Sequence, residues 1–114
     1  MKPVDEALDM LVPRFSHLPG FKYRKMFGGA SLYSDGLVFC LITNEGIPHF
    51  RIADSNIQDY IDAGQEAFSP KMKNAKGVMP YYTIPEEVIE DQLKLEEWAE
   101  KAIRAAREAK SGKK

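Results

Sequence analysis

Two histidines and one cysteine are the residues of this 114-residue chain whose side chains most often bind metals or act as nucleophiles. His17 and His49 have no HExxH spacing and no second nitrogen or sulfur ligand close in sequence, whereas a zinc site needs three or four converging ligands. Cys40 lies in a strongly apolar segment, where burial favours the neutral thiol over the reactive thiolate. The sequence therefore predicts no metal, no cofactor and no catalytic residue.

Glycines could cradle a phosphate, but the known phosphate-binding spacings are absent. Neither GxxxxGKS/T nor GxGxxG occurs in the chain. The nearest match is Gly28-Gly29, after Met26 and Phe27, and no helix start follows it to receive an anion. We interpret the two glycines as a bend, a bulge or a close backbone approach within a strand.

Two groups of basic residues lie near aromatic residues and could contact nucleic acid or an acidic partner. One group follows Phe21, and the other lies in a lysine-containing segment before two tyrosines. The candidate binding residues are Arg24, Lys25, Lys71, Lys73, Lys76, Tyr81 and Tyr82. The alternative interpretation is a solvated loop whose charges keep an edge strand from pairing.

The overall composition restricts the class of protein. Sixteen Lys and Arg against 17 Asp and Glu give a net charge of -1, which argues against a dedicated nucleic-acid binder. The length predicts one domain over residues 1–110 and a frayed tail over residues 111–114. The first residues carry acids where a signal peptide would need an apolar run, and no apolar run reaches the ~20 residues of a membrane span. We expect a cytoplasmic protein with no membrane partner.

Periodicity predicts the elements of the first half of the chain. An apolar helical stripe covers residues 4–15, and Pro13 predicts that this helix ends or bends near Val12. A period-two pattern runs from residue 21 to residue 34 and is interrupted by the two glycines. Asp35-Gly36 predicts a hairpin turn into a central strand over residues 37–42. Residues 47–52 form the next strand, with Pro48 either at a sheet edge or near the strand's start.

The second half is predicted to hold two helical regions and two strands. Asp54 is the expected N-cap of a helix over residues 55–63 that stops at Gly64. A short strand near Ala67-Phe68 and a strand over residues 78–84 follow. A capping box of Thr83 and Glu86 starts the next helix at Pro85. Asp91 caps a further helix, whose apolar stripe covers residues 95–106. The order is α-β-β-β-α-β-β-α, an α+β fold with an antiparallel sheet.

Several motifs resemble the N-terminal domain of the TfoX/Sxy family. They are RKMFGG at residues 24–29, LYSDG at 32–36 with Phe39, and MPYYTIPEEV at 79–88, with Trp98 in the last helix. The resemblance extends from Met10 to Ala106. It implies a fold similar to type III secretion chaperones and a relation to bacterial regulators of natural competence. The C-terminal domain of the full-length regulators is absent, so the chain resembles a stand-alone form, and the family offers no catalytic residues to transfer.

The expected function is a non-enzymatic cytoplasmic regulatory module that binds another protein. A transcriptional activator is one candidate partner, and a second copy of the chain is another. Direct nucleic-acid binding through the basic residues is the first alternative. The second alternative is a small-molecule binder or an enzyme with a pocket beside Gly28-Gly29, Tyr33 and Tyr82.

Overall fold

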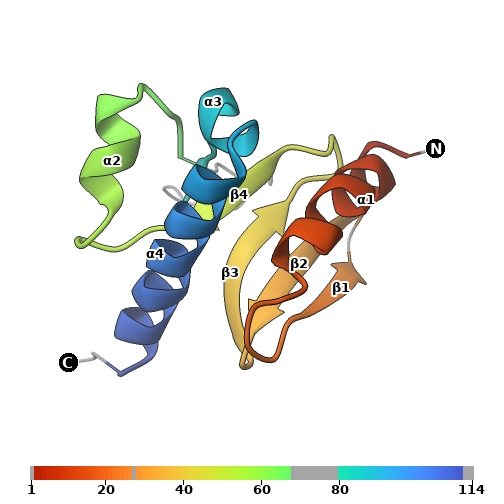
Figure 1. Cartoon of the computed structure of the whole chain (residues 1–114), viewed down its shortest axis with the longest axis horizontal. Coiled ribbons are helices and arrows are strands. Elements are labelled where there is room, and N and C mark those ends of the chain that lie inside the picture. The colour runs from red at the N-terminus through yellow and green to blue at the C-terminus, as the bar shows by residue number, and fades with distance from the viewer. Residues whose placement is uncertain (1, 27, 68–79, 112–114) are drawn as a thin grey trace, which may run out of the picture.

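The computed structural model describes residues 2–26, 28–67 and 80–111, and it is an α+β fold (Figure 1). Five strands form one antiparallel sheet in the order β1-β2-β3-β4-β5. The elements are α1 (Pro3–Phe15), β1 (Lys22–Met26), β2 (Gly29–Ser34), β3 (Leu37–Ile42), β4 (Pro48–Arg51), α2 (Ile57–Asp62), β5 (Tyr81–Thr83), α3 (Glu86–Ile89) and α4 (Gln92–Ser111). The predicted fold class is confirmed, with one more strand in the first half than expected.

Helix α1 does not end near Val12, which was one of the two outcomes predicted from Pro13, the other being a bend. The helix runs to Phe15 with Pro13 inside its last turn. Pro13 is exposed, so the carbonyl group that loses its N–H donor remains near water. Phe15 is fully buried. The centre of its ring lies 5.4 Å from the ring centre of Phe39 and 6.1 Å from that of Phe50. Packing of this aromatic residue outweighs the one main-chain hydrogen bond that proline removes.

The interrupted strand predicted over residues 21–34 is two strands, β1 and β2. They pair antiparallel from Lys22↔Tyr33 to Met26↔Gly29. Gly28 has a φ of 80°, which suits a hairpin turn. A Cβ atom at Gly29 would collide with the main-chain oxygen of Ile42 on β3. The two glycines therefore serve a turn and a close backbone approach, rather than a bend within one strand.

The predicted Asp35-Gly36 hairpin is confirmed between β2 and β3. Both residues have positive φ, 50° and 80°, as a type I′ turn requires. The register then shifts, because Leu32 pairs with Cys40 whereas Tyr33 pairs with Val38. This bulge leaves Phe39 without a partner on β2, and both Phe39 and Cys40 are fully buried.

Strand β4 begins at Pro48 and lies between β3 and β5, so the prediction of Pro48 near the strand's start is confirmed and an edge position is excluded. Ala67 forms only an isolated bridge with Tyr82, and Phe68 lies outside the described residues. The described part of the strand predicted at residues 78–84 is β5.

Two predicted helix caps are wrong, and a third is confirmed. Helix α2 starts after Asn56 rather than after Asp54. The N-cap of α3 is Pro85, without a side-chain cap hydrogen bond, so Thr83 and Glu86 form no capping box. The Thr83 hydroxyl instead donates to Gln65 Oε1 at 2.9 Å. Asp91 Oδ1 accepts hydrogen bonds from the main-chain N–H groups of Leu93 and Lys94 at 3.1 and 3.2 Å, as an N-cap does.

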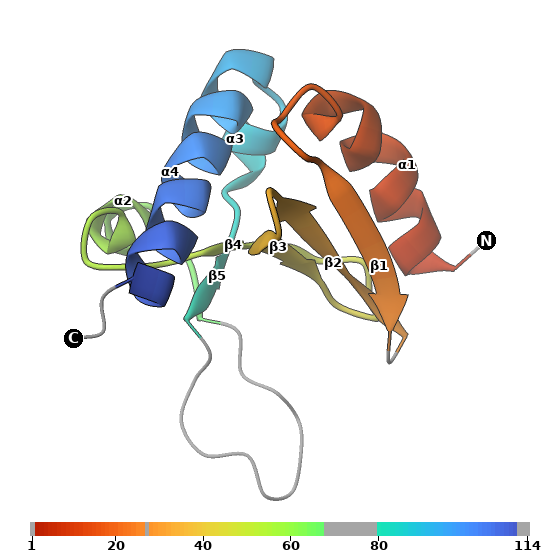
Figure 2. The ribbon, with the colours of Figure 1, turned by 90° about the horizontal axis from the view of Figure 1, so that it is seen from below.

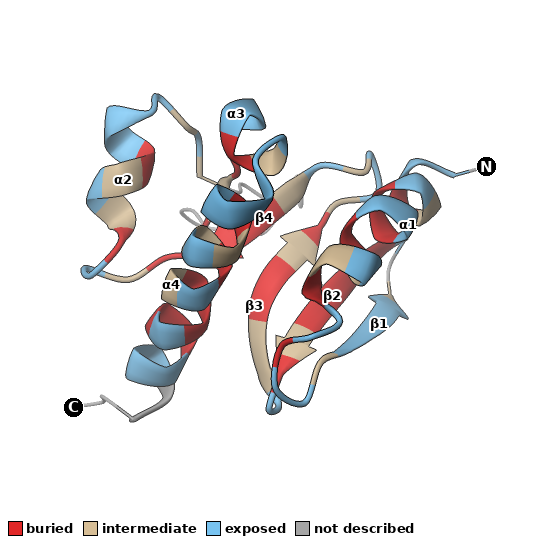
Figure 3. Cartoon of the chain, in the orientation of Figure 1, coloured by how far each residue is buried: buried red, intermediate tan, exposed pale blue. Residues whose placement is uncertain are grey.

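One face of the sheet is covered by α1 and α4, which lie on the same side of the strands (Figure 2). Their buried side chains join those of the sheet in a single apolar core (Figure 3). The core includes Leu8, Leu11 and Phe15 of α1, Leu32, Phe39, Cys40 and Phe50 of the sheet, and Leu95, Ala99 and Ala102 of α4. None of the helices in the described part of the chain has the length and apolar content that a membrane span requires.

Candidate binding surface

Strand β1 is an open edge of the sheet. It pairs only with β2, and four of its five residues are exposed (Figure 3). In an antiparallel ladder, every second residue of an edge strand directs its N–H and C=O groups away from the neighbouring strand. Within the described residues no main-chain bond to β1 is found beyond those of the β1–β2 ladder. The outer edge of β1 is thus available for pairing.

The register of the β1–β2 hairpin separates the side chains of β1 into two sets. Arg24 pairs with Ser31 and Lys22 with Tyr33, so these two cations share a face with Tyr33. Tyr23 pairs with Leu32 and Lys25 with Ala30. Because Leu32 and Ala30 belong to the core, Tyr23 and Lys25 lie on the face that carries the helices.

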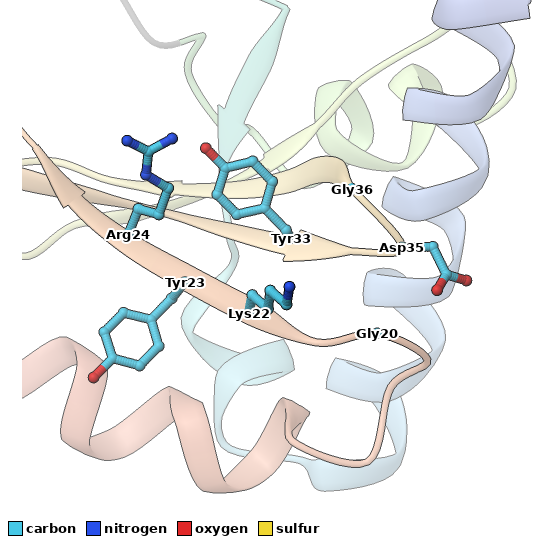
Figure 4. A pocket seen from close by; sticks show the side chains of 7 residues that line it. All are labelled: Gly20, Lys22, Tyr23, Arg24, Tyr33, Asp35 and Gly36. Carbon is cyan, nitrogen blue, oxygen red and sulfur yellow. The ribbon is translucent and has the colours of Figure 1, made fainter.

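A shallow hollow of about 530 Å³ lies beside β1. It is lined by Gly20, Lys22, Tyr23, Arg24, Tyr33, Asp35 and Gly36 (Figure 4). In the close view, Arg24 and Tyr33 lie on one side of β1, whereas Tyr23 points to the other side, toward α1. Lys22 and Arg24 form no ion pair with any residue in the described ranges. With Asp35 as the one carboxylate in its lining, the hollow carries a net positive charge.

The helix-bearing face of β1 has a different character. Tyr23 is 46% exposed, and with Leu8, Asp9, Val12 and Pro13 it lines a smaller hollow of about 180 Å³. Lys25 Nζ lies 2.5 Å from Asp5 Oδ1 on α1. This hydrogen bond lowers the pKa of Asp5 and raises the pKa of Lys25. The charge of Lys25 is therefore compensated, and the face is largely apolar.

The structure does not gather the binding residues predicted from the sequence into one cluster. Arg24 and Lys25 are neighbours on β1 but point to opposite faces. Tyr81 and Tyr82 lie on β5, at the other edge of the sheet. The guanidinium of Arg51 lies 5.4 Å from the centre of the Tyr81 ring, whereas Tyr82 packs against the core. Lys71, Lys73 and Lys76 lie outside the described residues.

Within the described residues, the structure does not bring Tyr33 and Tyr82 together beside Gly28-Gly29, as the suggested pocket would require. Leu32 on β2 pairs with Cys40, Cys40 pairs with Phe50, and Phe50 pairs with Tyr82, and paired residues lie on the same face of the sheet. Tyr33 follows Leu32 directly on β2. Tyr82 therefore shares the face of Leu32, and Tyr33 points to the opposite face. The sequence did not connect Tyr33 with Lys22, because this pairing depends on recognising a hairpin at Gly28.

Cys40 and Tyr60 belong to the core, whereas His49 is buried on the opposite face of the sheet. Burial raises the pKa of the Cys40 thiol and that of the Tyr60 hydroxyl. Burial also lowers the pKa of His49, whose Nδ1 lies 3.0 Å from the main-chain oxygen of Ile47. In the described ranges no three His, Cys, Asp or Glu side chains converge as a metal site would require.

A protein-family model matches most of this chain. A search of curated proteins finds none that matches the chain. A family model, the TfoX N-terminal domain, matches residues 14–106 of the 114. This family is linked to competence regulation. The matched range includes β1, the Asp35-Gly36 hairpin and Trp98 of α4. The chain belongs to the TfoX N-terminal domain family.

Proposed function

We propose that this chain is a non-enzymatic, cytoplasmic regulatory module that acts on competence gene expression by binding another protein. Membership of the TfoX N-terminal domain family supports the regulatory part of the proposal. The observation that supports protein binding is the open edge of β1, with its unpaired main-chain groups and exposed side chains. Addition of a strand to such an edge is a recurring way in which proteins bind extended segments.

Direct binding of nucleic acid is the competing function. Lys22 and Arg24 lie beside Tyr33 in the larger hollow, and cations beside aromatic rings are typical of single-strand binding. The net charge of -1 of the whole chain favours the protein partner. One experiment can separate the two functions.

Photo-crosslinking in the native cell tests which partner β1 contacts. The photoreactive residue p-benzoylphenylalanine is placed at position 23 in place of Tyr23, which is 46% exposed on β1. The control places it at position 93 in place of Leu93, which is 78% exposed on α4. We expect a defined protein adduct from position 23 that position 93 does not give. Adducts only with nucleic acid, or none in cells where the folded chain is present, would overturn the proposal.

The regulatory part is tested by transcript measurement. Cells that lack the chain are complemented with the wild type, with Arg24→Glu or with Arg104→Glu, a matched charge reversal at an exposed position of α4. We expect transcripts of DNA-uptake genes to change on deletion and to be restored by the wild type and Arg104→Glu, but not by Arg24→Glu. Unchanged transcripts in the deletion strain would contradict a regulatory role.

A further inference from the structure

Strand β1 offers main-chain hydrogen bonds along one side and different chemistry on its two faces. Uncompensated cations, Lys22 and Arg24, line the hollow on one face. The other face presents Tyr23 above Leu8 and Val12, and there Lys25 is compensated by Asp5. A strand laid along β1 would place alternate side chains on these two faces, because successive residues of a strand point to opposite sides.

We propose that β1 binds an extended segment of a partner protein in which acidic and apolar residues alternate, and that this segment joins the sheet as a sixth strand. Its carboxylates face Lys22 and Arg24, and its apolar side chains face Tyr23. This inference rests on the proposed function, since it specifies the chemistry of the protein partner. The main chain of β1 supplies the affinity, and the two faces supply the selectivity.

A second copy of the chain does not fit this edge. Three of the five residues of β1, Lys22, Arg24 and Lys25, are cationic, and none is acidic. Pairing two copies of β1 would bring the uncompensated Lys22 and Arg24 of one copy close to those of the other, and like charges on opposed strands destabilise a sheet. Charge complementarity favours an acidic segment from a different protein.

Exposure and size also agree with a single added strand. Tyr23 is 46% exposed on β1, and Met10 is 42% exposed on α1. The hollow on the helix side has a volume of about 180 Å³ and is lined by Leu8, Val12, Pro13 and Tyr23, with Asp9 as its one carboxylate. An aliphatic side chain can rest there against the Tyr23 ring, whereas a second carboxylate would meet Asp9. The apolar positions of the segment are thus assigned to this face.

Synthetic peptides test the alternation. The probe is a peptide, about seven residues long to exceed the length of β1, in which glutamate and valine alternate. One control has the same composition with the two residue types in separate blocks, and another has lysine in place of glutamate. We expect binding of the alternating acidic peptide alone, with amide chemical-shift changes centred on residues 22–26. Equal binding of the block peptide, or shift changes that avoid β1, would overturn the inference.

N-methylation of the peptide tests strand addition directly. In an antiparallel or parallel ladder, only alternate N–H groups of the peptide point toward β1. Two versions of the alternating peptide are N-methylated, one at its odd and the other at its even positions. We expect one version to lose binding and the other to retain it. Equal effects of the two patterns would show that the peptide is held by its charge alone, and would contradict strand addition.

A charge reversal on β1 tests the acidic face. Arg24→Glu should weaken binding of the alternating peptide about tenfold at low ionic strength, because it replaces an exposed attraction with a repulsion. The matched reversal Arg104→Glu on α4 should leave the affinity unchanged. Circular dichroism checks that both variants are folded. An Arg24→Glu variant that binds as tightly as the wild type would overturn the assignment of the acidic face.

The outcomes also separate this inference from the proposed function. Failure of the alternating peptide, together with a protein adduct from position 23, rejects the acidic and apolar segment but retains the protein-binding module. Absence of any protein adduct from position 23 rejects the module itself. In that case, binding of the peptide in solution would show that β1 can accept a strand although no protein contacts it in the cell.

Discussion

Asn56 joins the end of β4 to the start of α2 through its side-chain amide. Only 2% of the residue is exposed. Its Oδ1 accepts a hydrogen bond from the Ala53 N–H at 2.8 Å, and its Nδ2 donates to the Arg51 carbonyl oxygen at 3.0 Å. Buried main-chain groups that lack a ladder partner need such a side chain or an ordered water. Asn56 therefore fixes the chain where it leaves the sheet.

Replacement of Asn56 should destabilise the fold, whereas replacement of Asp54 should not. Asn56→Ala leaves the Ala53 N–H and the Arg51 carbonyl without their partner, at a cost of about 1–3 kcal/mol in the free energy of unfolding. Asp54 is exposed, so Asp54→Ala should change that free energy by less than about 0.5 kcal/mol. Urea denaturation of both variants measures the difference. A larger loss for Asp54→Ala would restore Asp54 as the helix cap.

The choice between these two residues could not be made from the sequence. Asp54 and Asn56 are both favoured N-cap residues, and both precede the apolar helical pattern of residues 57–61. What distinguishes them is burial at the end of β4, which depends on how the strand packs. Local preference predicted the helix, whereas tertiary contacts determined that Asn56 rather than Asp54 immediately precedes it, with its side chain bonded to Ala53 and Arg51 instead of to the helix.

Burial of His49 predicts a loss of stability at mildly acidic pH. Burial holds the pKa of His49 below its ordinary value of 6.5 in the folded state, so the unfolded chain binds a proton first as the pH falls. The contribution of the neutral His49 to the free energy of unfolding is then fully present above pH 6.5 and is lost as the pH falls below that value. Asp5, whose pKa lies below 3.8, does not contribute in this range.

Chemical denaturation at about pH 7.5 and about pH 5.5 measures this slope on either side of the His49 reference value. We expect His49→Gln to reduce the pH dependence of the free energy of unfolding, even where the substitution lowers stability at both pH values. The exposed His17 serves as the control, since His17→Gln should keep the decrease. A wild-type stability that rises on acidification through this range would contradict the neutral, buried imidazole.

At the scale of elements, Asp91 separates α3 from α4. Its carboxylate accepts the N–H groups of Leu93 and Lys94, which have no partner inside the helix. Asp91→Ala should lower the free energy of unfolding by about 1 kcal/mol. Glu90→Ala, one position earlier and also exposed, makes no such bonds and should change it by less than about 0.5 kcal/mol. Thermal unfolding followed by circular dichroism compares the two variants, and equal effects would contradict the cap.

The residues of the turns explain why the β2–β3 hairpin could be predicted from the sequence and the β1–β2 hairpin could not. Asp35-Gly36 lies between two strand-like segments, the second of them strongly apolar, so its type I′ preference has only one structural interpretation. The strand β1 is exposed on both faces and gives no burial pattern that marks its end. Gly28-Gly29 consequently fits a bend as well as a turn. Arg24 of the candidate surface was named from the sequence, but its association with Tyr33 was missed for the same reason, because these residues meet only when they belong to two paired strands.

At the scale of the whole molecule, the two edges of the sheet are protected differently. β5 is only three residues long and has the Ala67 bridge beside it. β1 is longer, and it relies on its cations, which natural sheets use to prevent edge-to-edge association. We therefore expect the feature that we assign to partner selection also to oppose pairing between copies of the chain.

Removal of these cations should convert the edge into a site of self-association. Lys22→Val combined with Arg24→Val removes two like charges from β1 and adds two residues of high strand propensity. We expect the wild type to sediment as a monomer and the double variant to form dimers or larger species that increase with concentration. The combination of Lys94→Val and Arg104→Val on α4 makes the same chemical change at exposed helical positions and should remain monomeric. A wild-type dimer with β1 amides protected from hydrogen exchange would show that the cations do not block pairing, and would reject both the edge protection and the acidic partner inferred from it.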